Sequence, residues 1–134
     1  MGELMTGGQI LLVEDNPLNR ELAEAILVRA GYEVLMAPNG ESALATARSE
    51  QPDLILMDIE LPGLDGLEAT RRLKADPSLR AIPVLALTAY AMRGDEQRCR
   101  AAGCDGYLTK PIDRMTLLDA VARCLPARRA EGVG

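Results

Sequence analysis

The chain has 134 residues, which fits one domain large enough to bury a hydrophobic core. Its formal net charge of −5 argues against nonspecific nucleic-acid binding, because such binding relies on cationic neutralisation of phosphates. The sequence contains no histidine, which excludes histidine-based catalytic triads and metal sites, and no Phe or Trp, which argues against stacking of large planar ligands.

The sequence indicates a cytoplasmic protein without a membrane segment. No apolar run approaches the roughly 20 residues that span a bilayer, and the N-terminus lacks the features of a signal peptide. The three cysteines form no C-x-x-C pair, which predicts free thiols and argues against a zinc site: Cys99, Cys104 and Cys124. Residues 1–8 are expected to be a flexible N-terminus, with Met5 as an alternative native start, and residues 126–134 a flexible tail.

In chain order, the first predicted elements are a buried strand and a helix. The strand covers Gln9–Asp15, and the helix after it has Asn16 as its N-cap and Pro17 at its first position. Gly31 is expected to end this helix in a left-handed conformation. Three apolar residues at four-residue spacing are expected to form its buried face: Leu18, Leu22 and Ile26.

The rest of the chain continues the alternation of short apolar runs and amphipathic segments. Strands are predicted at 32–37, 53–58, 83–88 and 106–110, and helices at 39–51, at 66–75 after an Asp65 cap, at 94–102, and at 113–125 with Asp113 as cap. Five strands alternating with five helices predict an α/β fold with a parallel sheet. The continuous apolar strands agree, because parallel strands are covered on both faces.

Polar residues stand where the predicted strands end. Glu14 and Asp15 close the first strand, Asp58 the third, Thr88 the fourth and Lys110 the fifth. The carboxyl ends of parallel strands lie along one edge of the sheet, so these residues should converge there. Three crowded carboxylates repel each other, and a hard divalent cation relieves that repulsion. The sequence therefore predicts a Mg²⁺ site, with Mn²⁺ as the alternative metal.

The stretch LILMDIELPGLDG drives an apolar strand into Asp58. A carboxylate in this position could attack phosphorus and form an aspartyl phosphate. Phosphoryl transfer depends mainly on positioning and on neutralising the phosphoryl oxygens, which the metal, Lys110 and the hydroxyl of Thr88 could provide. Taken alone, Asp58 could also be an ordinary polar residue that ends a strand.

Four motifs in this order resemble the receiver domain of bacterial two-component response regulators, over about residues 9–125. They are LLVEDN with the acid pair, LILMDIELPGLDG, PVLALTA and GYLTKPI. The resemblance implies a flavodoxin-like (βα)5 three-layer sandwich with a parallel sheet of order 2-1-3-4-5. It also implies a signalling module rather than a turnover enzyme.

The resemblance implies the roles of the site residues. Asp58 would accept a phosphoryl group from a phosphohistidine of a sensor histidine kinase or a histidine phosphotransfer protein. Asp15, Asp58 and the backbone carbonyl of Glu60 would bind Mg²⁺ directly, and Glu14 through a water. Thr88 and Lys110 would contact the phosphoryl group, and the Lys110–Pro111 peptide would be cis.

The resemblance also implies how the signal leaves. Thr88 would move toward the phosphoryl group and Tyr107 into the vacated space, which changes the face formed by the fourth helix, fifth strand and fifth helix. A downstream protein would bind that face, at Ala91, Met92, Tyr107 and Ile112. Glu60 and Tyr90 would flank the phosphoryl group, and we expect Tyr90 to hinder water and lengthen the phosphoryl lifetime.

Other functions fit the sequence less well. Within the receiver class, a stand-alone regulator is favoured, and a receiver excised from a hybrid histidine kinase is the alternative. An aspartyl-phosphate phosphatase of the haloacid-dehalogenase type would place a second Asp where Glu60 stands, and would carry a cap segment. A flavodoxin-like cofactor binder would have a phosphate loop after the first strand, where this chain has acidic residues.

Overall fold

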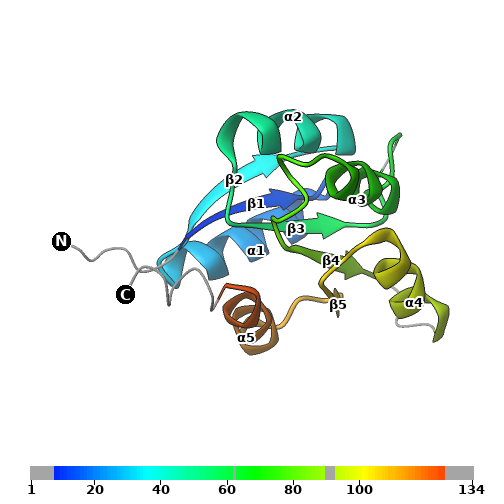
Figure 1. The fold of residues 1–134 in the computed structure, drawn as a ribbon. Coiled ribbons are helices and arrows are strands. Elements are labelled where there is room, and N and C mark those ends of the chain that lie inside the picture. The colour runs from blue at the N-terminus through cyan, green and yellow to red at the C-terminus, as the bar shows by residue number, and fades with distance from the viewer. Residues whose placement is uncertain (1–7, 62, 90–92, 126–134) are drawn as a thin grey trace.

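The computed structural model of the chain describes residues 8–61, 63–89 and 93–125. These residues form a parallel sheet of five strands in the order β2-β1-β3-β4-β5, flanked by five helices. The elements are, in chain order, β1 Gln9–Val13, α1 Pro17–Arg29, β2 Glu33–Ala37, α2 Gly40–Glu50, β3 Leu54–Asp58, α3 Gly66–Ala75, β4 Val84–Thr88, α4 Arg93–Ala102, β5 Gly106–Thr109 and α5 Arg114–Cys124. The predicted fold class and strand order are therefore confirmed (Figure 1).

The predicted element boundaries agree with the structure to within one or two residues. The largest difference is at β1, which ends at Val13, so Glu14 and Asp15 lie in the turn that follows. At the other end, Gly8 was expected in the flexible N-terminus, but its carbonyl accepts a hydrogen bond from the backbone N–H of Glu33 at 3.0 Å. The expected flexible segments 1–7 and 126–134 lie outside the described residues.

The sheet separates two apolar cores, which makes the molecule three-layered. On one face, strand residues such as Leu12 and Leu56 pack with α1 and α5, and on the other, Leu11 and Met57 pack with α2, α3 and α4. Figure 1 shows α2 and α3 above the strands and α1 and α5 below them. Because alternate residues of each strand face opposite cores, both sides of β3 must be apolar, as its uninterrupted hydrophobic run predicts. No helix in the described ranges combines the length and the hydropathy needed to cross a membrane.

The predicted buried face of α1 is wrong. Leu18 and Leu22 are 77% and 44% exposed, and Ile26 alone of the predicted three is buried. The helix instead buries Ala23, Ile26 and Leu27, which follow the i, i+3, i+4 spacing. A four-residue step advances by more than one helical turn, so two such steps drift away from a single face. The small side chain of Ala23 faces the sheet, and the two leucines lie in solvent.

Both ends of α1 match the sequence signals. The Asn16 side chain accepts hydrogen bonds from two N–H groups of the first turn, and Pro17 stands at the first helical position. Gly31 has φ of +99°, and the bonds Gly31 N to Val28 O and Tyr32 N to Leu27 O, at 3.0 and 3.1 Å, form a Schellman ending. This turn brings the chain directly back into β2.

The hydrogen-bond ladder continues beyond the strand ends and fixes the sheet edge. Asp58 pairs with Leu87, and the backbone N–H of Ile59 donates to the carbonyl of Leu87 at 3.0 Å. One strand further, the N–H of Lys110 donates to the carbonyl of Thr88 at 2.8 Å. The ends of β3, β4 and β5 are therefore held in one register.

Helix α3 begins directly against the backbone of β3. Asp65 caps the helix by accepting a hydrogen bond from the N–H of Glu68 at 2.8 Å, which places Gly66 over the strand end. A Cβ at Gly66 would meet the carbonyl oxygen of Asp58 and would lie 2.6 Å from the Cα of Ile59. Only glycine allows this approach without displacing the backbone that carries Asp58.

We predict that Gly66→Ala lowers the free energy of unfolding by about 1–3 kcal/mol, because the added methyl overpacks a backbone contact. Urea denaturation measures this change. Gly94→Ala is the control, since a Cβ there meets no atom of the described part of the chain within 4 Å, and it should be neutral or stabilising by up to about 1 kcal/mol. Equal effects of the two substitutions would contradict the role of close packing at Gly66.

Candidate functional site

Three carboxylates meet at the edge of the sheet. Glu14 and Asp15 follow β1, and Asp58 ends β3, and one ligand oxygen of each lies within 4.8 Å of the others. Glu14 and Asp58 are each 1% exposed, whereas Asp15 is exposed. The turn carrying Glu14 is held by a hydrogen bond from its N–H to the carbonyl of Ala37 at 3.2 Å. The structure thus gathers carboxylates that stand more than forty residues apart.

Lys110 brings the compensating charge from the end of β5. Its Nζ lies 3.0 Å from Oδ2 of Asp58 and 3.3 Å from Oε1 of Glu14, and its side chain is 13% exposed. The peptide bond between Lys110 and Pro111 is cis. The three acids and this one ammonium leave two formal negative charges in the cluster.

The ionisation of Glu14 and Lys110 reflects this crowding. Burial raises the pKa of Glu14, the neighbouring carboxylate of Asp58 raises it further, and Lys110 only partly offsets both. For Lys110, burial works to lower the pKa, but the contacts with Asp58 and Glu14 outweigh it and raise the pKa above its usual value. Lys110 is therefore a firmly charged ammonium beside carboxylates that still repel each other.

The residues present fit a hard divalent cation. Oε1 of Glu14 is buried and accepts no hydrogen bond from any residue that the structure describes. Lys110 Nζ lies 3.3 Å away, so their contact is electrostatic without hydrogen-bond geometry. A buried carboxylate oxygen normally has a hydrogen-bond partner, and an ion or an ion-bound water would supply one here. The donors are all oxygens, which suits Mg²⁺, and two positive charges would balance the cluster.

On the β4 side, the hydroxyl of Thr88 and the N–H of Ala89 both contact Glu60. Oγ1 of Thr88 donates to Oε2 of Glu60 at 3.3 Å, and the N–H of Ala89 lies 3.2 and 3.3 Å from the two carboxylate oxygens. The backbone N–H of Glu60 meanwhile donates to Oδ1 of Asp58 at 2.9 Å. Thr88 is fully buried, so its hydroxyl has a fixed position at the edge of the site.

The other residues for which the sequence predicts a role are not part of this cluster in the described structure. Tyr107 is half-buried and packs against the core shared by α2, α3 and α4. Ile112, expected to contact a partner, is buried at 9% exposure and offers little surface in this conformation. Tyr90, Ala91 and Met92 lie outside the described residues.

Sequence reasoning missed two features of the site. Glu60 was placed beside the acceptor, but its side-chain bonds to Thr88 and Ala89 were not foreseen, because they join the ends of two different strands. Gly66 was assigned only to a helix start, and its contact with the backbone of Asp58 and Ile59 was missed. The glycine following the Asp65 cap is the one sequence signal that could have suggested such an approach.

Comparison with known proteins agrees with this geometry. A family model described as the response regulator receiver domain matches residues 10–122. The polar-differentiation response regulator DivK of Brucella anthropi is 48% identical over 112 residues, which cover 84% of this chain and 91% of that protein. The residues matched by the family model include all four strand ends that form the cluster.

Solved structures of similar sequence share the fold. The receiver domain of sensor histidine kinase PA1611 from Pseudomonas aeruginosa, which has a magnesium ion coordinated in its active-site cleft, is 43% identical with a TM-score of 0.84, over 90% of this chain and 99% of that one. The chemotaxis response regulator CheY4 of Vibrio cholerae is 32% identical with a TM-score of 0.84, over 90% of this chain and 100% of its own. The relatives therefore include both a regulator and a kinase-attached domain.

We predict that Glu14→Gln raises the free energy of unfolding at pH 7 in chelator by about 0.5–2 kcal/mol, the common range for one stabilising substitution. The pKa of Glu14 is higher in the folded state than in the unfolded state. The free energy of unfolding therefore falls as the pH rises from the unfolded-state pKa to the folded-state pKa of this carboxyl. The variant should lose this part of the pH dependence. Denaturation at several pH values measures it.

Glu41→Gln is the matched control, since Glu41 is exposed in the first turn of α2. It should change the free energy of unfolding at pH 7 by less than about 0.5 kcal/mol, as expected for an exposed position. A Glu14→Gln variant that is less stable than the unaltered chain at pH 7 would show that the carboxylate is not strained. In Mg²⁺ the gain from Glu14→Gln should shrink, because the cation already relieves the repulsion.

Proposed function

We propose, from the premise that the chain belongs to the family of response regulator receiver domains, that Asp58 accepts a phosphoryl group from a phosphohistidine on a partner protein. The observation that carries the proposal is the setting of the Asp58 carboxylate, which contacts Lys110 and lies among the ligand oxygens of Glu14 and Asp15. This chain contains no histidine, so the donor histidine belongs to the partner. Receiver domains as a class take their phosphoryl groups from histidine kinases.

The transfer is a displacement at phosphorus. A carboxylate oxygen of Asp58 attacks the phosphorus, a new P–O bond forms, and the P–N bond of the phosphohistidine breaks with its electron pair passing to the imidazole. The product is an acyl phosphate on Asp58. Lys110 and the hydroxyl of Thr88 stabilise the charge on the transferred oxygens, which is the main requirement of phosphoryl transfer.

A divalent cation belongs to this proposal. Asp15, Asp58 and the backbone carbonyl of Glu60 would hold Mg²⁺, or Mn²⁺ in its place, and Glu14 would contact it through a water. When bound, the cation would neutralise charge on the phosphoryl oxygens. The support is the oxygen-only donor set and Oε1 of Glu14, which has no hydrogen-bond partner among the described residues.

A phosphatase with rapid turnover is less consistent with the site. Such an enzyme needs an acid beside the nucleophile that can protonate the leaving group. Glu60 stands in that position, but its carboxylate is already engaged by the hydroxyl of Thr88 and the N–H of Ala89, so it does not point toward a leaving group. The acyl phosphate is therefore proposed to persist as a signal, with Glu60 and Tyr90 as the residues that set its lifetime.

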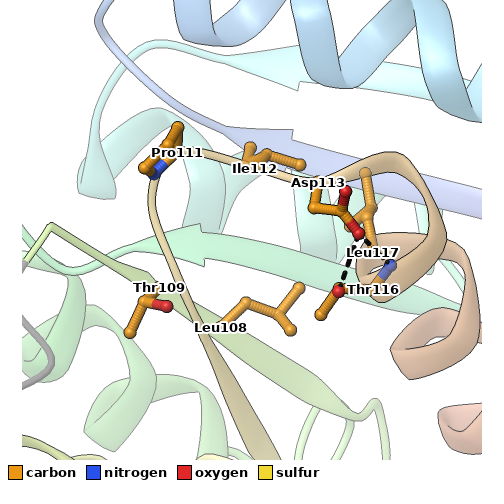
Figure 2. Close-up of a pocket in the computed structure, with 7 residues that line it drawn as sticks. All are labelled: Leu108, Thr109, Pro111, Ile112, Asp113, Thr116 and Leu117. Carbon is orange, nitrogen blue, oxygen red and sulfur yellow. Dashed lines mark hydrogen bonds between the residues drawn. The ribbon is translucent and has the colours of Figure 1, made fainter.

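The signal is proposed to leave through α4, β5 and α5. Thr88 and Tyr107 would change position together on phosphorylation. Lys110 is bonded directly to Pro111, which lines a cavity of about 120 Å³ at the β5–α5 junction. Figure 2 shows this cavity beside the start of α5, where Asp113 accepts hydrogen bonds from the N–H and hydroxyl of Thr116. A shift of Lys110 would thus be transmitted to this junction.

The phosphodonor is proposed to dock on the first turns of α1. Leu18 stands four residues after Glu14, is 77% exposed, and has the exposed Leu22 one turn behind it. A partner that brings a phosphohistidine to Asp58 must cover the rim of the site, and apolar side chains there would be buried by it. The cytoplasm is the proposed compartment, in keeping with the free thiols.

Incubation with Mg²⁺ and acetyl phosphate tests the central proposal. Intact-mass spectrometry should show one added phosphoryl group, and Asp58→Asn should abolish it because the nucleophilic carboxylate is lost. Asp119→Asn, at an exposed position of α5, is the control and should label normally. Labelling that survives Asp58→Asn, or that needs no divalent cation, would count against the mechanism.

Leu18→Asp should slow phosphotransfer from a partner kinase by about tenfold, the cost of losing one ordinary apolar contact in an interface. Labelling by acetyl phosphate should be unaffected, because a small donor needs no docking surface. Val28→Asp, at the far end of the same helix and 53% exposed, is the matched control. If Leu18→Asp and Val28→Asp slow the kinase reaction equally, the docking position is wrong.

A further inference from the structure

The Glu60 carboxylate already occupies an anion-binding position next to Asp58. Two donors from β4 and the residue after it converge on this carboxylate, namely Oγ1 of Thr88 at 3.3 Å and the N–H of Ala89 at 3.2 Å. A fixed hydroxyl and a backbone N–H that point to one place are the elements of an oxyanion site. The site is therefore filled by a side chain of the same protein.

The donors bound to Glu60 are those that a phosphoryl group on Asp58 would need. Asp58 and Thr88 end adjacent strands, and the Glu60 backbone N–H donates to Oδ1 of Asp58 at 2.9 Å. The same residue thus contacts the acceptor through its backbone and the β4 donors through its side chain. A phosphoryl group attached to Asp58 lies within reach of these donors and is, like Glu60, an anion.

Two anions cannot share these donors at low cost. The Glu60 carboxylate and a phosphoryl group a few ångströms apart would repel each other. The anion that loses its hydrogen bonds to Thr88 and Ala89 is bound less strongly at this position. Glu60 is exposed, so its side chain has room to move into solvent. Removal of its carboxylate from Thr88 and Ala89 is then a step that must accompany phosphorylation.

We infer that Glu60 is an internal competing anion, which occupies the phosphoryl subsite formed by Thr88 and Ala89 before phosphorylation and must be displaced by the incoming group. This inference rests on the proposed phosphorylation of Asp58, and it adds a role that precedes the transfer. In this role, Glu60 lowers the affinity of the site for phosphoryl-like anions. It also holds the hydroxyl of Thr88 toward the site without phosphate.

Binding of beryllofluoride in Mg²⁺ tests the inference without any transfer step, because this anion attaches to an aspartate carboxylate as a phosphoryl mimic. Glu60→Ala removes the competitor and should lower the dissociation constant by about tenfold, the equivalent of one hydrogen bond to a charged group. Glu60→Gln keeps the shape and loses the charge, so it should fall between Glu60→Ala and the unaltered chain. Glu41→Ala, at an exposed position of α2, should have no effect.

Backbone amide NMR of the same variants, without Mg²⁺ or anion, gives an independent readout. Glu60→Ala should shift the amide resonance of Ala89 strongly, since that N–H loses its carboxylate acceptor. Glu41→Ala should leave the Ala89 resonance in place. If beryllofluoride binds Glu60→Ala no more tightly than the unaltered chain, or if the Ala89 resonance does not move, the inference is overturned.

The outcomes separate this inference from the proposed function. Failure of the unaltered chain to gain a phosphoryl group from acetyl phosphate would overturn the proposed function, whatever the Ala89 resonance does. Normal labelling of Asp58 together with unchanged anion affinity in Glu60→Ala would overturn only the role of Glu60. Faster labelling of Glu60→Ala by acetyl phosphate, by about the same tenfold factor, would support both.

Discussion

The site depends on one electrostatic balance, the contact of a single ammonium with buried carboxylates. Lys110 lies 3.0 Å from Asp58 and 3.3 Å from Glu14 at an edge where both acids are almost inaccessible to water. Buried carboxylates without a counter-charge would take up protons and lose their nucleophilic and metal-binding character. Because one positive charge cannot neutralise the cluster, the balance stays incomplete. The remaining negative charge favours binding of a cation. With a cation bound, the cluster would be near neutral and could accept a phosphoryl anion.

The charged side chains of the site are held in place by the hydrogen-bond register of the sheet rather than by a dedicated loop. The parallel ladder extends past β3, β4 and β5, so Asp58, Thr88 and Lys110 are each held by backbone bonds to the neighbouring strand end. Gly66 then allows α3 to rest on the carbonyl of Asp58 itself. Against this fixed background, the Glu60 side chain is exposed and can exchange one set of partners for another. The site thus combines fixed donors with one movable anion.

Much of this arrangement could be predicted from the sequence, because the governing signals are local. Apolar runs that end in an acid, a threonine or a lysine mark the strand ends, and a parallel sheet brings those ends to one edge. Asn16, Pro17 and Gly31 likewise mark the ends of α1. The prediction of the buried face of α1 was wrong, because that face depends on how the helix is rotated against the sheet and α5. The side-chain bonds of Glu60 depend on the spacing between two strands, which no local pattern encodes, and the chemical roles of the site residues stay predictions.

The exposed leucines of α1 have a wider consequence. Leu18 and Leu22 take no part in the core, which is built from Ala23, Ile26 and Leu27 on the other side of the helix. Substitutions at exposed positions outside the core usually change stability by less than about 0.5 kcal/mol. The stability of the fold therefore tolerates other amino acids at these two positions, and the packing at the sheet edge does not depend on them. Under the proposed docking of the phosphodonor on α1, a change at these two positions would alter partner recognition and leave the fold intact.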